Sequence, residues 1–278
     1  MYTYISSKDN DKIKYIKKLD TKKYRDKENL YIIEGIKMSL EVVNSMSLKQ
    51  NIEFALYSKE ILQSINNGDK MLDSLKNLSD KTNVIETTKE VINYLTSTVT
   101  PQGIILVVKK SKKDIFNYIK ENKNNKFLIV DRVQDAGNLG SIIRSANAFD
   151  CKNIICVKGT TDPFSDKVIR STMGGFLKTN IFEVEKDEIK LLINTLKDQN
   201  YNIAVTALYN SVEFEEAKLQ GKINEKTIFV VGNEANGACD EFLNNADIRV
   251  RLKMSEDAES LNVAMATSIC LYEQYVLK

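Results

Sequence analysis

The chain has 278 residues, 42% hydrophobic and 28% charged, a composition typical of a globular protein of about two domains. It contains no histidine, which excludes His-dependent catalytic triads and removes the most common zinc ligand, so we expect no metal site. No apolar run approaches the roughly 18 residues of a membrane span, and residues 1–19 lack a signal-peptide core. We therefore expect a cytoplasmic protein without a membrane partner, whose four cysteines are reduced.

The net charge of +2 is unevenly distributed. Residues 1–30 carry nine basic and five acidic side chains, and residues 109–126 carry seven lysines and two acidic side chains. Clustered basic charge suits the binding of phosphate groups, as in nucleic acids. A solvated lysine-rich surface would explain the same distribution.

Residues 1–108 alternate between helical and strand patterns, which predicts a small layered α/β domain. Residues 109–126 are polar and charged and predict a linker. The predicted helices are 11–19, 36–46, 59–65, 70–78 and 89–95, and the predicted strands are 30–35, 52–58, 83–88 and 102–108.

Residues 127–278 predict a second α/β domain. Its apolar strands alternate with helices, as in a parallel sheet covered on both faces, whose ligands bind at the carboxyl ends of the strands. The predicted strands are 127–131, 153–157, 201–208, 227–232 and 247–252, and the predicted helices are 137–149, 187–199, 240–246 and a last one after Ser260.

Three segments in this second domain carry polar residues that the fold alone does not require. "GNLGSIIR" contains Asn138 and Arg144, and "GNEANG" contains Glu234. In "ESLNVAMATSICLY" we expect Ser260 to cap a core-facing helix, which leaves Asn262 without a structural role. Helix caps, a glycine-rich turn and a solvent-facing arginine would account for each segment taken alone.

Taken together and in this order, the patterns N-x-G-x-x-x-R, G-N-E-x-x-G and S-L-N-V resemble the SpoU (TrmH-type) RNA ribose methyltransferases of the SPOUT superfamily. The likeness covers about residues 125–276 and includes "DPFSDKVIRSTMGGF", and residues 8–108 resemble the L30e-like substrate-binding domain often fused to that family. The resemblance implies a trefoil-knotted parallel-sheet domain and an L30e-like α/β domain. It implies S-adenosylmethionine as cofactor, bound by Thr206, Val231, Gly232, Leu252, Met254 and Leu261, and catalysis by Asn138, Arg144, Glu234, Ser260 and Asn262.

The implied reaction is methylation of a ribose 2′-hydroxyl in structured RNA, ribosomal RNA first and tRNA as the alternative. The family's usual assignment makes Arg144 the base, but a guanidinium stays protonated at working pH. We therefore expect Arg144 to orient the hydroxyl, while the proton passes to phosphate, water or Glu234. The resemblance also implies a homodimer.

Two alternative interpretations of the function, from other classes of protein, stay open. One is a catalytically inactive RNA-binding protein, and the other is an α/β enzyme acting on a small metabolite. The sequence contains neither a G-x-G-x-x-G dinucleotide turn nor a G-x-x-x-x-G-K-[ST] phosphate loop.

Overall fold

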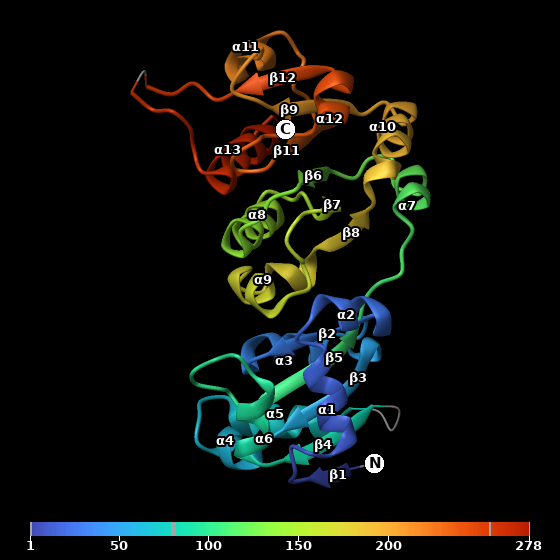
Figure 1. The fold of residues 1–278 in the computed structure, drawn as a ribbon, viewed down its shortest axis with the longest axis vertical. Coiled ribbons are helices and arrows are strands. Elements are labelled where there is room, and N and C mark those ends of the chain that lie inside the picture. The colour runs from blue at the N-terminus through green and yellow to red at the C-terminus, as the bar shows by residue number, and fades with distance from the viewer. Residues whose placement is uncertain (1, 79–81, 256, 278) are drawn as a thin grey trace. The chain divides into compact units, whose positions relative to one another are not determined.

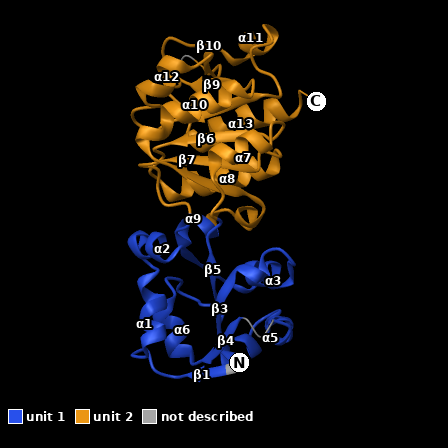
Figure 2. Cartoon of the chain, turned by 90° about the vertical axis from the view of Figure 1, so that its right-hand side faces the viewer, with its two compact units in different colours: residues 1–111, 164–170 blue, residues 112–163, 171–278 orange. Residues whose placement is uncertain are grey.

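The computed structural model describes residues 2–78, 82–255 and 257–277 and shows two compact units (Figure 2). Residues 109–126, expected as a linker, instead contain the helix α7 (Ile115–Glu121), which buries Ile115 and Ile119 in the second unit. The sequence of this segment allows an amphipathic turn or two, and the structure places its two isoleucines in the core of unit 2. Unit 1 comprises Met1–Ser111 and Phe164–Arg170, and unit 2 comprises Lys112–Pro163 and Ser171–Lys278.

Unit 1 contains a mixed five-stranded sheet in the order β1-β4-β3-β5-β2. Strands β1, β4 and β3 are parallel, whereas β5 is antiparallel to both β3 and β2. The edge strand β1 was not predicted, because four residues are too few to show an alternating pattern. The strands are β1 (Tyr2–Ile5), β2 (Leu30–Glu34), β3 (Ile52–Tyr57), β4 (Asn83–Thr87) and β5 (Ile104–Lys109).

Helices cover both faces of this sheet, α1 and α6 on one and α3 and α5 on the other (Figure 2). The helix α2 was not predicted, because its sequence KKYRDKE has no apolar stripe. Its buried Arg25 donates to the carbonyl of Leu19 at 2.6 Å, a side-chain contact that helical periodicity does not predict. The helices are α1 (Asp11–Lys18), α2 (Lys22–Glu28), α3 (Ile36–Asn44), η1 (Lys49–Asn51), α4 (Lys59–Gln63), α5 (Gly68–Lys76) and α6 (Lys89–Leu95).

Glu34, the last residue of β2, is a buried acid in unit 1. Its side chain is 8% exposed, and its Oε2 has no hydrogen bond in the described structure. Arg170 of the same unit lies 3.6 Å away, and Arg170 also pairs with Asp166 at 2.7 Å. Burial, reinforced by the charge of Asp166, raises the pKa of Glu34 from 4.5 to about 7, although Arg170 opposes this shift.

We expect Glu34→Gln to stabilise the protein at pH 8.5 but not at pH 5. The folded-state pKa lies above the unfolded value, so the free energy of unfolding falls as pH rises from about 4.5 to 7. Glutamine cannot ionise and removes this loss, which solvent screening reduces to about 1–2 kcal/mol. Urea unfolding of both proteins at the two pH values measures the difference, and equal stability at pH 8.5 would contradict the assignment.

Unit 2 contains a seven-stranded sheet in the order β10-β12-β9-β11-β6-β7-β8. Every neighbouring pair in it is parallel, as predicted. The central strands β6 and β11 are buried along their whole length, which explains their continuous apolar runs. The strands are β6 (Phe127–Asp131), β7 (Asn153–Val157), β8 (Asn180–Val184), β9 (Asn202–Thr206), β10 (Val212–Glu213), β11 (Thr227–Val231) and β12 (Ile248–Arg251).

Helices cover this sheet on both sides, with α8 and α13 on one face and α7, α10 and α12 on the other (Figure 1). The core on the second side joins α7 and α10 to strands β6, β7, β9 and β11 through aliphatic and aromatic side chains. The remaining helices of the unit are α8 (Ala136–Ala148), η2 (Gly175–Lys178), η3 (Lys186–Glu188), α10 (Ile189–Asp198), α11 (Phe214–Leu219), α12 (Asp240–Asn245) and α13 (Val263–Tyr275), while α9 (Asp166–Ser171) lies almost wholly in unit 1.

Helix α13 corrects two predictions about the C-terminal segment. Its N-cap is Asn262, whose Oδ1 accepts from the amides of Ala264 and Met265 at 2.9 and 3.3 Å, and not Ser260. The expected core-facing stripe is also wrong in part. Ala264 is buried, but Leu261, Met265 and Tyr272 are 41%, 57% and 49% exposed, and the buried positions are Ala264, Thr267, Cys270, Leu271 and Gln274.

Candidate functional site

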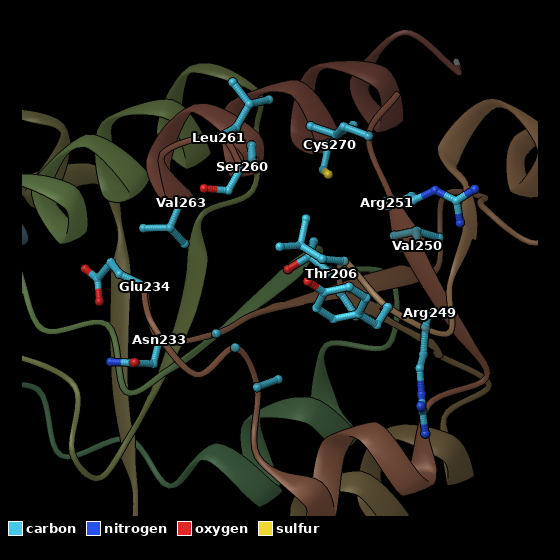
Figure 3. Close-up of a pocket in the computed structure, with 18 of the residues that line it drawn as sticks. Thr206, Asn233, Glu234, Arg249, Val250, Arg251, Ser260, Leu261, Val263 and Cys270 are labelled. Carbon is cyan, nitrogen blue, oxygen red and sulfur yellow. The ribbon is translucent and has the colours of Figure 1, made fainter. Parts of the chain in front are cut away.

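A pocket of about 580 Å³ lies at the carboxyl ends of β9, β11 and β12. Figure 3 shows side chains from the end of β9 (Thr206), from the segment before α13 (Ser260) and from α13 itself (Cys270) around this space. Parallel strands end at one edge of the sheet, so segments that are distant in sequence share one cavity. Most of the lining comes from residues 206–210, 232–238, 249–252 and 260–263.

Gly232 makes the sharp turn at the end of β11 possible. A Cβ at this position would lie 2.1 Å from both the carbonyl carbon of Gly237 and the amide nitrogen of Ala238. Asn233 and Gly237 close the loop by exchanging backbone hydrogen bonds of 2.9 and 3.0 Å. The backbone at Gly232 therefore lies closer to the backbone of Gly237 and Ala238 than a residue with a Cβ would allow. This loop forms one wall of the pocket.

A chain of three polar side chains joins this loop to α8 and α13. Asn262 Nδ2 donates to Asn138 Oδ1 at 2.9 Å, and Asn138 Nδ2 donates to Glu234 Oε1 at 2.9 Å. Asn262 and Glu234 line the pocket, while Asn138 lies between them. The structure thus links the three sequence segments directly and gives Asn262 a structural role as well as a place at the site.

Glu234 is held as a carboxylate. Burial alone would raise its pKa, but hydrogen bonds from Asn138 and from the backbone amides of Gln134 and Asp135 outweigh burial and lower the pKa. These two amides lie 3.2 and 3.3 Å from its oxygens. A carboxylate stabilised by three donors is a weak base and a strong hydrogen-bond acceptor.

The structure brings together most of the residues expected at the site. Glu234, Ser260 and Asn262 line the pocket, as do five of the residues expected to bind the cofactor. Val231, which precedes Gly232 in the chain, is buried and does not line the pocket. The five are Thr206, Gly232, Leu252, Met254 and Leu261.

Arg144 lies outside the lining of the pocket in its own chain. It is exposed on α8, and its guanidinium makes no hydrogen bond or ion pair with any residue that the structure describes. Its backbone packs against η2, where Gly175 would place a Cβ 3.5 Å from the Cα of Arg144. The side chain is therefore available to a ligand, although the structure does not bring it to the other site residues.

Sequence reasoning missed several lining residues. Tyr209 follows β9 and is 83% exposed, and the buried Cys270 reaches the pocket from the second turn of α13. The position of Tyr209 after a predicted strand could have revealed it, whereas that of Cys270 depends on how α13 packs.

Within residues 2–78, 82–255 and 257–277, no group of Cys, Asp and Glu is arranged to hold a metal ion. In the same part of the chain no helix is long and apolar enough to span a bilayer.

Comparison with known sequences bears directly on this site. Residues 125–272 match the SpoU rRNA Methylase family, and residues 10–106 match the MRM3-like substrate binding domain. The chain is 30% identical over 271 residues to the 23S rRNA (guanosine(2553)-2′-O)-methyltransferase RlmP of Bacillus subtilis (strain 168), an alignment covering 96% of this chain and 97% of that protein.

Solved structures agree with the sequence comparison. The AdoMet-bound rRNA methyltransferase from Sinorhizobium meliloti superposes with a TM-score of 0.82 and 26% identity, over 99% of this chain and 98% of that one. The SpoU methyltransferase AviRb from Streptomyces viridochromogenes, at 20% identity, shares the fold with a TM-score of 0.79 over 96% of this chain and 98% of its own. The expected α/β fold with a parallel sheet and the resemblance drawn from the three motifs are confirmed, while the trefoil knot stays a prediction: the chain belongs to the SpoU rRNA Methylase family.

Proposed function

We propose that this protein transfers a methyl group from S-adenosylmethionine to a ribose 2′-hydroxyl of ribosomal RNA. The observation that carries the proposal is the hydrogen-bonded chain Glu234–Asn138–Asn262 at the edge of the pocket. The name of the Bacillus subtilis relative, an rRNA 2′-O-methyltransferase aligned over almost its full length, supports the substrate class. We include the expected cytoplasmic location in the proposal.

The residues of the pocket fit an amphipathic cofactor of this kind. Leu252, Met254 and Leu261 offer apolar contacts, and the turn at Gly232 exposes backbone groups without an intervening side chain. Its volume of about 580 Å³ lies within the range of small-molecule sites, about 300–1,000 Å³. When bound, the cofactor supplies an electrophilic methyl group, so the protein has mainly to position the accepting hydroxyl.

In this proposal the accepting ribose hydroxyl is positioned by Arg144 and by the hydrogen-bonded side chains Glu234, Asn138 and Asn262. Asn262 is fixed by its cap bonds to α13, and Asn138 by its bond to Glu234, so each amide is held in one orientation at the edge of the pocket. Arg144 binds the phosphate next to the target ribose and directs its hydroxyl. The hydroxyl proton passes to phosphate, water or Glu234, whose carboxylate lies at the same pocket. Ser260 contributes a hydroxyl at the pocket wall.

The decisive experiment offers the purified protein S-adenosylmethionine with a labelled methyl group and three substrates: unmodified ribosomal RNA, unmodified tRNA and a mixture of small metabolites. We expect label in ribosomal RNA at a single ribose, located by reverse transcription at low nucleotide concentration. Label in tRNA alone would show that the substrate is tRNA and not ribosomal RNA. RNA binding without transfer, with intact cofactor binding, would indicate an inactive RNA-binding protein.

Unit 1 is proposed to bind the RNA substrate. The match of residues 10–106 to a substrate binding domain supports this role, as does the net basic charge of residues 1–30. Several lysines of this region lie against aromatic rings, for example Lys17 at 5.3 Å from the ring of Tyr94, which is 38% exposed. A cation beside an exposed ring can contact both a phosphate and a base.

A homodimer formed through α13 also belongs to the proposal. Met265, Ile269, Tyr272 and Val276 recur at helical spacing and are 57%, 42%, 49% and 46% exposed. They form an apolar stripe on one side of the helix, which a second copy could cover by two-fold symmetry.

We expect Ile269→Glu to convert the dimer into a monomer, because a charge would be buried in the apolar interface. Light scattering at micromolar concentration measures the mass. Leu219→Glu is the matched control, since Leu219 is 89% exposed on α11, away from the stripe, and its replacement should leave the mass unchanged. A wild-type protein that is already monomeric would refute the dimer.

A further inference from the structure

Asp131 and Arg132 form an ion pair at the carboxyl end of β6, next to the site. Asp131 is completely buried, and its two oxygens accept from Arg132 Nε and Nη2 at 3.0 Å each. The paired geometry uses both oxygens and two nitrogens, which is the strong form of this interaction. Hydrogen bonding to Asp131 raises the pKa of Arg132, so its guanidinium stays charged.

This pair is fastened to the loop that carries Glu234. Asp131 Oδ2 accepts from the amide of Cys239 at 2.7 Å, and Arg132 Nη2 donates to the carbonyl of Gly237 at 3.1 Å. The carbonyl of Arg132 accepts from Asn233 Nδ2 at 3.0 Å. The beginning and the end of the loop are thus both held by two adjacent residues, the last one of β6 and the one that follows it.

The backbone of Arg132 is itself held in an unusual conformation. Its φ of +61° lies in the left-handed region, which costs a residue with a Cβ roughly 1 kcal/mol. The amide of Arg132 donates to Thr160 Oγ1 at 2.9 Å, and that hydroxyl donates to the carbonyl of Val130 at 3.0 Å. Two residues further on, the amides of Gln134 and Asp135 face Glu234. The turn therefore directs both donors toward the carboxylate.

We propose that Asp131 and Arg132 are a positioning pair for methyl transfer. Their hydrogen bonds hold the loop 233–239 in place. Because Glu234 belongs to this loop and bonds Asn138, they also set the positions of Asn138 and Asn262. Asp131 is fully buried and its carboxylate is occupied by protein donors, so it acts through the loop and not on the ligand. This role rests on the proposed function, since its consequence for turnover requires that the protein methylates RNA.

The proposal predicts a specific pattern for Arg132→Gln and Arg132→Lys. Both lose the two-pronged bond to Asp131, and lysine keeps only a point charge. We expect turnover per folded site to fall about tenfold or more in both variants. We also expect amide hydrogen exchange to rise about tenfold in residues 233–239 and to stay unchanged in β7 and β8. Asp131→Asn should show the same pattern if it folds.

A double-mutant cycle separates positioning from simple stability. If Arg132 acts through Glu234, Arg132→Gln should reduce turnover by less than about threefold in a Glu234→Gln background. A purely structural effect would lower the folded fraction by the same factor in both backgrounds and would leave turnover per folded site unchanged. Lys158→Met is the control, because the exposed ion pair of Lys158 with Glu185 lies after β7, outside the loop, so turnover and exchange should be normal.

The exchange measurement needs no catalytic activity. Wild-type protein that fails to methylate RNA would refute the proposed function, while exchange in residues 233–239 would still test the positioning pair. Unchanged exchange in this loop in Arg132→Gln, or equal turnover losses in the two backgrounds, would overturn the proposal.

Discussion

Replacing Arg144 with alanine should lower turnover by about 100-fold or more, with little change in cofactor affinity or stability. Arg144 is exposed and makes no polar contact within the described chain, so its loss should cost no more than about 0.5 kcal/mol of unfolding free energy. It also lies outside the pocket lining, so cofactor binding should persist. Single-turnover methylation, calorimetric titration with the cofactor and thermal unfolding measure the three quantities.

The variant Arg144→Lys tests whether the arginine acts by orienting the substrate or by its positive charge alone. Lysine retains the positive charge but not the planar fork that can hold phosphate and hydroxyl together, so it should restore only a small part of the turnover. Lys152→Ala is the matched control, since Lys152 is a half-exposed cation of the same unit that pairs with Asp150. Near-normal methylation by Arg144→Ala would remove this residue from the reaction.

Gly232→Ala should abolish cofactor binding and destabilise unit 2. The added Cβ would lie 2.1 Å from the backbone at Gly237 and Ala238, and no flexible side chain can move aside to accommodate it. The loop 233–238 would have to shift, and both the pocket wall and the position of Glu234 would change with it. We expect a loss of about 1–3 kcal/mol in unfolding free energy, and cofactor affinity below detection in calorimetry.

Gly175→Ala provides the comparison for Gly232→Ala. Its Cβ would meet its nearest neighbour, the Cα of Arg144, at 3.5 Å, an ordinary van der Waals distance. Cofactor affinity and stability should therefore stay near wild type. Unchanged cofactor affinity in Gly232→Ala would mean that the turn at the end of β11 does not shape the pocket.

The sequence by itself determined the features that depend on local pattern. Continuous apolar runs predicted strands buried on both faces, and the intervening amphipathic segments predicted their helices, which together require a parallel sheet. Because such a sheet gathers its carboxyl ends at one edge, ligands were expected there, and the resemblance to the SpoU family assigned Asn138, Glu234 and Asn262 to one site. The structure joins the three side chains in an unbroken hydrogen-bonded chain.

Only the tertiary structure decided how these residues are used. Ser260 and Asn262 are both good caps, and Asn262 caps α13 while its amide nitrogen bonds Asn138, a partner 124 positions away. In the same way, the burial of Arg25 and Ile119 depends on contacts that periodicity in polar segments does not reveal. The residue that caps a helix, the side chains that are buried and the contacts that hold a loop depend on which partners are within reach, and the packing of the whole chain decides this.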